Sequence, residues 1–443
     1  MEKKMPGFML GKTHVPHRKN TAGMESVRMP VPETVIIPTS QHIGAPATPT
    51  VKVGDTVYVG TKIGEAGGYV SSPIHSSVSG KVKKIDSLLL VGGRSCAAIV
   101  IESDGLMTPD PSVAPPKVDN LDGFIAAVRE SGLVGLGGAG FPTAVKLDAE
   151  KKGLIHRLVI NGAECEPYIT SDTLTMRNDA DYIREGVKLL QKYLTLEEVF
   201  IGIESNKPDC IEKLRETFSY DETVKVVSLP STYPQGAEKV LIYNTTGLIV
   251  PEGGLPADVG CLVMNVTSVA FLAKYFETGM PLVEKCVTVD GSAIKNPMNV
   301  IAPIGTPVEK LIEFTGGFSK EPGKIMYGGP MMGSAMYSAE YPVLKNTNAI
   351  VALDKKDAKP PVQRNCIHCG RCVAACPIGL NPTLFARSMK VEDKAERAAR
   401  LEEAKIGLCM ECGCCSFVCP SARPLVQTNR LAKADLRANG AKK

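Results

Sequence analysis

The 443-residue chain contains Cys366-Ile-His-Cys-Gly-Arg-Cys-Val-Ala-Ala-Cys376-Pro377 near its end, followed by Cys409-Met-Glu-Cys-Gly-Cys-Cys-Ser-Phe-Val-Cys419-Pro420. Both stretches have the spacing C-x2-C-x2-C-x3-C followed by Pro. In this pattern three closely spaced thiolates bind one [4Fe–4S] cluster, and the fourth reaches the other cluster of a pair. Residues 360–430 are therefore predicted to form an α-helical dicluster domain of the ferredoxin type.

The crossing of the fourth cysteine divides the eight predicted ligands into two sets. One cluster is assigned to Cys366, Cys369, Cys372 and Cys419, and the other to Cys376, Cys409, Cys412 and Cys415. Zinc is the alternative, but zinc sites use pairs of C-x2-C rather than triplets followed by Cys-Pro. Cys414 is expected not to be a ligand. Because such clusters pass one electron at a time, we expect a two-electron group elsewhere in the chain.

Composition narrows the functions that the chain can have. The net charge of +4 is too small to favour nucleic acid as a partner. The chain contains no apolar run of the ~20 residues that a membrane span needs, and Met1–Gly11 is not a secretory signal. Of the 14 cysteines, most fall in the two C-terminal stretches, which indicates metal ligation rather than disulfide bonds.

The first part of the chain, residues 1–110, is predicted to hold an N-terminal arm and a β half-barrel of the barrel-sandwich hybrid type. Its short β-branched runs are separated by turns such as Val51-Lys-Val-Gly-Asp55. Carrier domains of this type modify a Lys at a hairpin tip, but the corresponding Ser72-Pro-Ile-His-Ser76 has no Lys. We therefore expect a structural role for this domain.

After a Pro-rich linker, residues 117–282 alternate short buried strands with helices, which predicts a Rossmann-like parallel α/β domain. Residues 283–345 are predicted to form a small β-grasp-like module, with a helix over Thr306–Phe314 that Thr306 caps. Residues 431–443 form a basic tail, which either docks an acidic partner or membrane surface or is a solvated helix end.

Two segments of the α/β domain carry residue types that suit a nucleotide. The glycines of Gly132-Leu-Val-Gly-Leu-Gly-Gly-Ala-Gly-Phe-Pro-Thr143 let the backbone approach a phosphate or a flat ring, and a helix N-terminus follows. Lys146 adds a positive charge. Leu158-Val-Ile-Asn-Gly-Ala-Glu-Cys-Glu-Pro167 ends a strand with two carboxylates that can bind ribose hydroxyls or ring nitrogens. A tight turn and a solvated loop are the alternatives.

These segments resemble the flavin-binding subunit of respiratory complex I. Gly135-Leu-Gly-Gly-Ala-Gly-Phe-Pro-Thr-Ala-Val-Lys146 resembles its glycine loop, and Asn161-Gly-Ala-Glu-Cys-Glu-Pro167 its N-x-D-E-x-E-P. Leu136 stands where that family has Arg, and Ala163 where it has Asp. The later flavin-edge segments of that family resemble Gln235-Gly-Ala-Glu-Lys239 and Asn265-Val-Thr267.

The whole chain, over roughly residues 10–425, resembles the RnfC family, whose members belong to the Rnf electron-transport complex. The resemblance rests on the two cluster motifs, the half-barrel and Ser40-Gln-His-Ile-Gly-Ala-Pro46. His14, Pro16 and Lys19 partly match the N-terminal His-Pro-Pro stretch of that family.

The resemblance implies bound FMN, an NAD(H) site and an SLBB-like fold for the β-grasp module. A flavin exchanges both hydride and single electrons, so no side chain is assigned a catalytic role. FMN is expected to be held by Gly135, Gly137, Gly138 and Lys146. Its edge is expected to be lined by Asn161, Glu164, Asn265 and Thr267, and the nucleotide contacted by Phe141, Glu166 and Glu238.

The resemblance also implies a peripheral subunit on the cytoplasmic face of the cell membrane. Its complex would couple ferredoxin:NAD+ electron transfer to Na+ or H+ translocation by membrane subunits. The other implied partners are an iron–sulfur subunit and ferredoxin, bound directly or through another subunit. Two alternatives stay open: a soluble NADH-dependent reductase resembling the corrinoid reductases, and an electron-relay adaptor without a nucleotide site.

Overall fold

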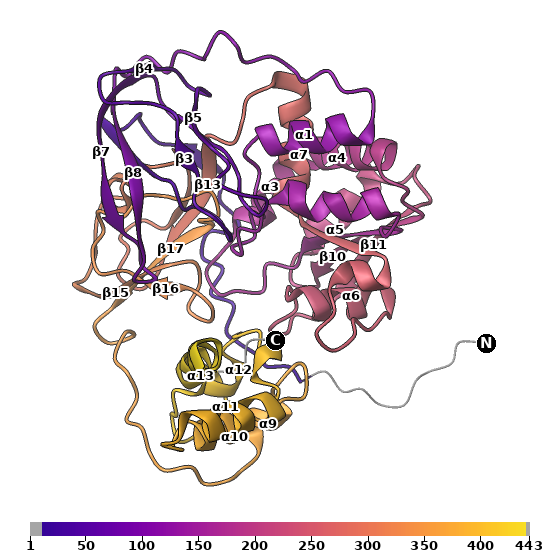
Figure 1. The fold of residues 1–443 in the computed structure, drawn as a ribbon, viewed down its shortest axis with the longest axis vertical. Helices are drawn as coiled ribbons and strands as arrows, with labels where there is room; N and C mark the ends of the chain where they lie inside the picture. Colours follow the sequence, from indigo (N-terminus) through magenta and orange to yellow (C-terminus); the bar gives the residue numbers. More distant parts are fainter. Residues whose placement is uncertain (1–10, 440–443) are drawn as a thin grey trace.

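Four structural units follow one another along the chain: a β half-barrel, an α/β domain, a second β domain and a helical domain (Figure 1). The computed structural model describes residues 11–439. Within this range, no helix combines the length and the apolar character that crossing a membrane requires.

The half-barrel consists of two small antiparallel sheets. Their strands are β2 (Thr34–Pro38), β3 (Thr48–Pro49), β4 (Thr56–Val57), β5 (Lys62–Glu65), β6 (Ile74–His75), β7 (Gly80–Leu89) and β8 (Ser95–Ser103). The strand orders are β2-β8-β7-β4 and β3-β5-β6. Alternate residues such as Val35, Ile37, Ile99 and Ile101 are fully buried between the sheets. Apolar residues therefore recur at every second position because one face of each strand is buried.

The α/β domain is built on a parallel sheet with the order β11-β10-β9-β12. Its strands are β9 (Arg157–Gly162), β10 (Glu198–Glu204), β11 (Val224–Leu229) and β12 (Cys261–Asn265). Its helices are α1 (Leu121–Glu130), α2 (Thr143–Leu147), η1 (Asp148–Lys152), α3 (Ser171–Asn178), α4 (Ala180–Tyr193), α5 (Pro208–Thr217), α6 (Glu238–Thr246), η2 (Pro256–Val259) and α7 (Val266–Thr278).

Helices cover both faces of this sheet. Leu158 and Ile160 pack in the core that includes α4 and α7, whereas Val159 packs on the opposite face with α6. Successive strand residues point to opposite faces, so both must be apolar. This double burial explains the continuous hydrophobic runs from which the strands were predicted.

The second β domain has a sheet with the order β1-β14-β13-β17-β15-β16. Its elements are β1 (Ser26–Arg28), β13 (Glu284–Asp290), β14 (Met298–Pro303), α8 (Val308–Phe314), β15 (Pro322–Tyr327), β16 (Ser334–Ala335) and β17 (Ala349–Asp354). Two strands of this sheet lie outside the expected range 283–345. They are β17, which is central in the sheet, and β1, which comes from the N-terminal arm. Thr306 does not cap α8; its hydroxyl donates to the Pro303 carbonyl instead.

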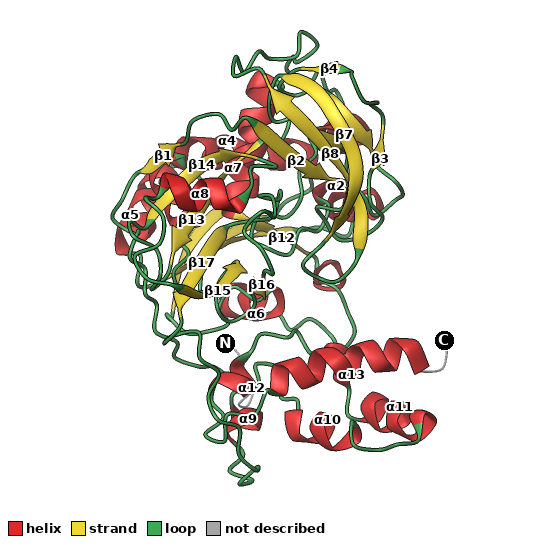
Figure 2. Ribbon diagram, turned by 90° about the vertical axis from the view of Figure 1, so that its left-hand side faces the viewer, coloured by secondary structure: helices red, strands yellow, loops and turns green. Residues whose placement is uncertain are grey.

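The C-terminal domain is helical and lies apart from the α/β sheet in both views (Figures 1 and 2). Its elements are α9 (Arg371–Ala374), α10 (Pro382–Ser388), α11 (Lys394–Glu403), η3 (Ile406–Leu408), α12 (Cys414–Phe417) and α13 (Leu425–Asn439). Helix α13 continues across the expected start of the tail at residue 431. Its Arg430 and Lys433 form ion pairs with Glu411, so these two charges are partly neutralised within the domain.

Candidate functional site

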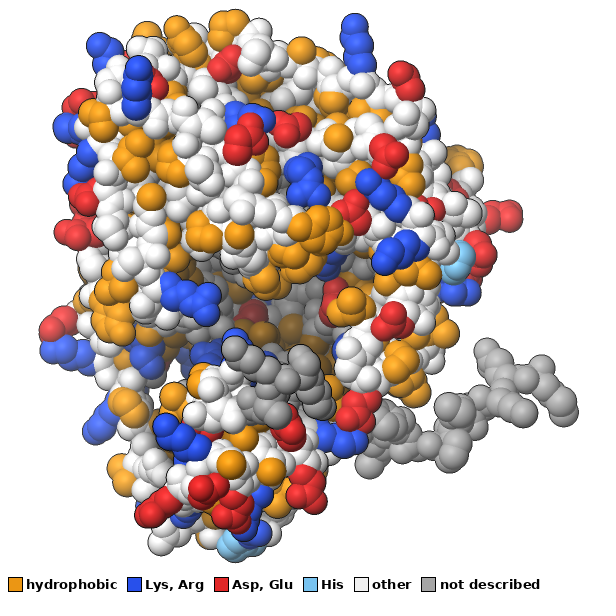
Figure 3. Space-filling view, in the orientation of Figure 1, with side chains coloured by type: hydrophobic (Ala, Val, Ile, Leu, Met, Phe, Trp, Pro, Cys, Tyr) orange, Lys and Arg blue, Asp and Glu red, His pale blue; other side chains and the backbone are white. Residues whose placement is uncertain are grey.

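A cavity of about 1300 Å³ lies where the α/β, second β and helical domains meet. It opens at the hollow in the middle of the face shown in Figure 3. Its floor includes Asn161 and Asn265, which are paired with each other at the carboxyl ends of the neighbouring strands β9 and β12. The sheet order reverses between these strands, and α/β sheets bind ligands at such switch points. The cavity exceeds the ~300–1,000 Å³ of typical small-molecule sites, so it has room for more than one nucleotide.

The structure brings nearly all the predicted cofactor residues to this cavity. Its lining includes Gly135, Gly137, Gly138, Phe141, Lys146, Asn161, Glu164, Glu166, Glu238 and Asn265. Thr267 is the exception, because it lies behind the lining. Its hydroxyl donates to Asp172 Oδ1 at 2.7 Å.

The glycine loop is closed by its own backbone. Gly135 N donates to the Phe141 carbonyl at 2.8 Å, and Gly140 N donates to the Gly135 carbonyl at 3.2 Å. Gly138 and Gly140 have φ of +109° and +68°, a region that favours glycine. A Cβ on Gly137 would lie 3.1 Å from Asn265 Nδ2. The loop thus presents bare backbone to the cavity, as close approach of a phosphate or ring requires.

Lys146 and Glu238 come from different helices and form an ion pair at the cavity wall. Lys146 Nζ lies 3.0 Å from Glu238 Oε1 and 3.1 Å from the Val263 carbonyl. Both side chains stay partly exposed. The ammonium is therefore held in place and remains accessible to an anionic ligand.

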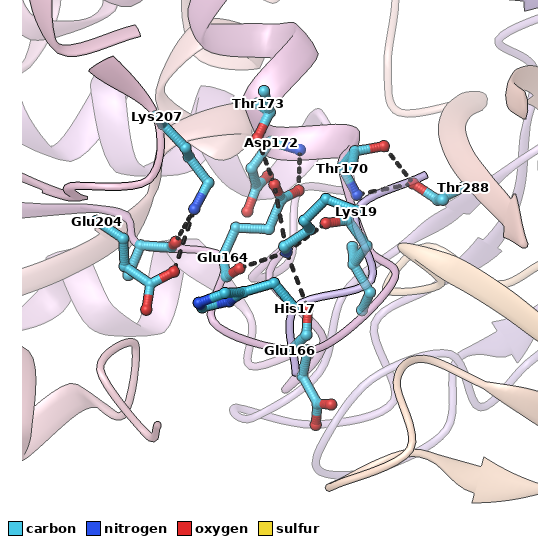
Figure 4. Close-up of polar contacts among 12 residues, drawn as sticks. His17, Lys19, Glu164, Glu166, Thr170, Asp172, Thr173, Glu204, Lys207 and Thr288 are labelled. Carbon is cyan, nitrogen blue, oxygen red and sulfur yellow. Dashed lines mark hydrogen bonds and ion pairs between the residues drawn. The ribbon is translucent and has the colours of Figure 1, made fainter. Parts of the chain in front are cut away.

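Residues 161–170, called the acid loop here, carry the two predicted carboxylates (Figure 4). Glu164 accepts hydrogen bonds from Asp172 N at 2.7 Å and Thr173 Oγ1 at 2.5 Å, at the start of α3. Glu166 accepts from Met331 N and Met332 N of the second β domain, at 3.2 and 2.7 Å. Burial raises the pKa of Glu166 to about 7, and the two N–H donors oppose that shift.

Asp172 is a cavity residue that sequence reasoning missed. Its Oδ2 accepts from Asn265 Nδ2 at 2.7 Å and its Oδ1 from Thr267 Oγ1. Burial raises the pKa of Asp172, while its hydrogen bonds to Thr267 and Asn265 oppose the shift. Its position in the first turn of α3 is visible in the sequence, but its contact with the end of β12 and the start of α7 is not.

Both departures from the complex I pattern face the protein interior. The Leu136 side chain is 1% exposed and packs in the α/β core. Ala163 is fully buried, and its carbonyl accepts from Lys207 Nζ at 2.6 Å. Neither position offers a polar side chain to the cavity.

The predicted cysteine ligands fall into two groups in space. A hollow in the helical domain is lined by Cys376, Cys409, Cys412, Cys414 and Cys415. Cys376 thus lies with the second triplet. Cys372 lies near Cys366 and Cys419, whose charges add to the rise in its pKa that burial causes. This grouping supports the predicted crossing of the fourth cysteines.

Nitrogen donors surround the cysteine sulfurs, as is usual where thiolates bind iron–sulfur clusters. Asn429 Nδ2 lies 3.5 Å from Cys409 Sγ, and Leu380 N donates to Cys376 Sγ at 3.2 Å. Cys414 Sγ lies 3.8 Å from the Tyr233 carbonyl, toward the α/β domain. The donor set fits thiolate ligands of [4Fe–4S] clusters.

The cavity and the cysteine hollow share a wall. Ile378 and Met410 line both, and each follows a predicted ligand closely in sequence. Cys369 of the other group is exposed. The Cys376 group therefore lies beside the cavity, and the Cys366 group includes a cysteine at the surface.

Comparison with known families matches the four units in the predicted order. The family models are the RnfC barrel sandwich hybrid domain over residues 8–106, the Nuo51 FMN-binding domain over 128–274, the SLBB domain over 286–335 and the 4Fe-4S dicluster domain over 363–423. The predicted fold class is confirmed by these matches. The chain thus contains an FMN-binding domain and a 4Fe-4S dicluster domain.

Among whole proteins, the chain is similar to the RnfC-type subunits of two ferredoxin:NAD(+) oxidoreductase complexes. It is 47% identical to that of the Na(+)-translocating complex of Acetobacterium woodii, over 86% of this chain and 87% of the relative. It is 42% identical to that of the proton-translocating complex of Clostridium ljungdahlii, over 83% and 81%.

Among solved structures, an NAD+-reducing [NiFe]-hydrogenase in the air-oxidized state shares the fold. The TM-score is 0.51 at 18% identity, over 73% of this chain and 62% of the other.

Proposed function

Because the chain belongs to the RnfC family, the RnfC-type subunits of ion-translocating ferredoxin:NAD+ oxidoreductase complexes, we propose that it exchanges hydride with NAD(H) at FMN and passes single electrons through two [4Fe–4S] clusters. When bound, FMN supplies the conversion between a two-electron and a one-electron step. The chain supplies binding, orientation and the electron path.

The observation that carries this proposal is the wall that the cavity shares with the cysteine hollow at Ile378 and Met410. A flavin in the cavity and a cluster on Cys376, Cys409, Cys412 and Cys415 would be neighbours. The exposed Cys369 would place the second cluster next to an electron partner.

The cavity residues divide into three roles. The glycine loop cradles FMN, and Lys146 attracts its phosphate. Asn161, Glu164 and Asn265 position its edge, with Asp172 as an additional carboxylate. Ring stacking and ribose contacts of the second nucleotide are assigned to Phe141, Glu166 and Glu238.

The chain's place in a complex is also a proposal. Both relatives are named as one of several subunits that form a complex. The chain would sit as a peripheral subunit on the cytoplasmic face, with membrane subunits, an iron–sulfur subunit and ferredoxin as partners. The relatives' names include both Na+ and protons, so either ion is a candidate for coupling.

Anaerobic reconstitution of the full chain tests the cofactors and the reaction together. We expect FMN at one equivalent, iron and sulfide for two [4Fe–4S] clusters, and NADH-dependent reduction of ferricyanide. A reconstituted chain with both clusters but without FMN or ferricyanide activity would contradict the proposal and favour an electron-relay adaptor.

A further inference from the structure

The N-terminal arm, residues 11–24, runs from the cysteine hollow to the acid loop. Thr13 and Tyr233 exchange two backbone hydrogen bonds, at 2.9 and 2.8 Å. Gly11 leaves no room for a side chain, because a Cβ there would overlap the Cys376 carbonyl. The Tyr233 hydroxyl donates to the Cys412 carbonyl at 2.8 Å. The arm is thus fixed to both the cavity wall and the helical domain.

Lys19 of this arm inserts its ammonium group beneath the acid loop (Figure 4). Its Nζ donates to the carbonyls of Glu164, Glu166 and Ile169, at 2.7, 2.9 and 2.5 Å. The three carbonyls match the three N–H donors of a protonated amine; burial lowers the pKa of Lys19, and the Glu164 carboxylate opposes that shift. The Lys19 side chain is 13% exposed, and its Nζ also lies 3.9 Å from Glu164 Oε2.

The acid loop needs such a partner for two reasons. Glu164 and Tyr168 have φ of +49° and +71°, and residues other than glycine pay about 1–3 kcal/mol each for such conformations. Three carbonyls also converge on one point, where buried acceptors without a donor destabilise the fold. The Lys19 ammonium satisfies all three at once and thereby stabilises the strained loop.

We propose that Lys19 is a positioning residue of the FMN site, which holds the acid loop in its binding conformation before the cofactor arrives. Glu164 and Glu166 then face the cavity without a further ordering cost. Lys19 lines neither the cavity nor the cysteine hollow, so it is not expected to contact FMN or a cluster. This inference rests on the proposed FMN function of the cavity.

The test compares three variants of the full chain with the wild type. Lys19→Met removes all donors at similar length, and Lys19→Gln keeps two N–H donors without the charge. Arg397→Met is the matched control, because the Arg397 side chain is 14% exposed and donates to both carboxylate oxygens of Asp435 at 2.8 Å. It removes a similarly buried cation that contacts neither the acid loop nor the glycine loop.

Two measurements are made on each reconstituted protein: the FMN dissociation constant and amide hydrogen exchange of the acid loop without FMN. We expect Lys19→Met to raise the dissociation constant about tenfold or more, which corresponds to about 1.4 kcal/mol of ordering cost. Exchange in the loop should accelerate in parallel, and Lys19→Gln should show a smaller change in both. Arg397→Met should lower the melting temperature but change the FMN dissociation constant less than about twofold.

The outcomes separate this inference from the proposed function. If the wild type does not bind FMN, the proposed function fails and this inference falls with it. If the wild type binds FMN, unchanged affinity in the folded Lys19 variants overturns the inference alone. An equal loss of affinity in Arg397→Met would also overturn it, because the effect would then reflect general destabilisation. If Lys19→Met does not fold, Lys19→Gln decides.

Discussion

The last cysteine of each stretch lies near cysteines of the other stretch. Cys376 ends the first cysteine stretch but lies with Cys409, Cys412 and Cys415. Cys419 ends the second stretch but lies near Cys372. This placement fits the predicted crossing, in which each stretch provides its fourth cysteine to the other cluster.

The crossing predicts an uneven effect of one substitution. Cys419→Ser should remove the cluster on Cys366, Cys369 and Cys372 and leave the cluster of its sequence neighbours. Iron content should fall by about half, and one of two electron paramagnetic resonance signals should remain. Cys414→Ser is the control and should keep both clusters. Loss of the Cys409 group's signal in Cys419→Ser would contradict the crossing.

Leu136 decides a second residue-scale question, because related flavin proteins have Arg at this position. Its side chain lies in the core, so Leu136→Arg should bury an unpaired charge rather than add a flavin contact. The expected loss of unfolding free energy is about 3–5 kcal/mol, measured by denaturant titration. Leu106→Arg, at a site that is 75% exposed, is the control. Tighter FMN binding in a stably folded Leu136→Arg would contradict the placement.

At the scale of elements, the site is a junction of strand ends, short helices and loops. β9 and β12 present their carboxyl ends side by side, and α2 and α6 bring Lys146 and Glu238 to one wall. The glycine loop also contacts the second β domain, because Asn346 Nδ2 donates to the Gly138 carbonyl at 2.8 Å. The shape of the glycine loop therefore depends both on its own left-handed glycines and on its contact with the second β domain.

Two left-handed glycines allow these effects to be separated. Gly140 and Gly153 have similar φ, +68° and +63°, but a Cβ would lie 3.0 Å from Asn346 Nδ2 only at Gly140 and meets nothing within 4 Å at Gly153. Both Gly→Ala variants should lose about 1–2 kcal/mol of stability. Only Gly140→Ala should also weaken FMN binding, measured by fluorescence titration. Equal FMN affinity in the two variants would contradict a role for the loop geometry.

At the scale of the whole molecule, the domains are joined around the cavity by a few polar contacts. Glu166 binds the second β domain, and Tyr233 binds the Cys412 carbonyl. The Lys405–Glu252 ion pair, 2.7 Å long, also reaches the helical domain but is more than half exposed, so it adds at most ~1 kcal/mol. The buried contacts of Glu166 and Tyr233 therefore contribute more than this ion pair to keeping the domains around the cavity in place.

The spatial order of the sites predicts an obligatory sequence of electron transfer. In the wild type, a chemically reduced chain should reoxidise both clusters when NAD+ is added. In Cys412→Ala, which removes the nearer cluster, the outer cluster should stay reduced, while NADH–ferricyanide activity should persist. Cys369→Ala is the control, in which NAD+ should still oxidise the nearer cluster. The oxidation state of each cluster is measured by electron paramagnetic resonance. If NAD+ reoxidises the outer cluster of Cys412→Ala as fully as that of the wild type, the result would contradict this order.

Patterns of short range were enough to predict much of this architecture. The period of two in the half-barrel and the buried runs of the α/β sheet reflect burial on one or both strand faces. The cysteine spacing reflects the geometry of one cubane. The glycine loop and the two carboxylates of the acid loop were recognised from their residue types, whereas Glu238 and Asn265 were assigned through the family resemblance. The predicted sequence range of the second β domain does not include β1 and β17, because these strands join its sheet from outside residues 283–345.

The kinds of domain, their order and the types of ligand could be predicted from local sequence patterns and the family resemblance. The folded structure was needed to show that Lys19 binds carbonyls up to 150 residues away, that Asp172 reaches the cavity, and that Glu166 receives N–H donors 165 and 166 residues away. It also decided that cavity and cysteine hollow share a wall. No local spacing relates such residues, because their contact energy exists only once packing of separate domains has brought them together.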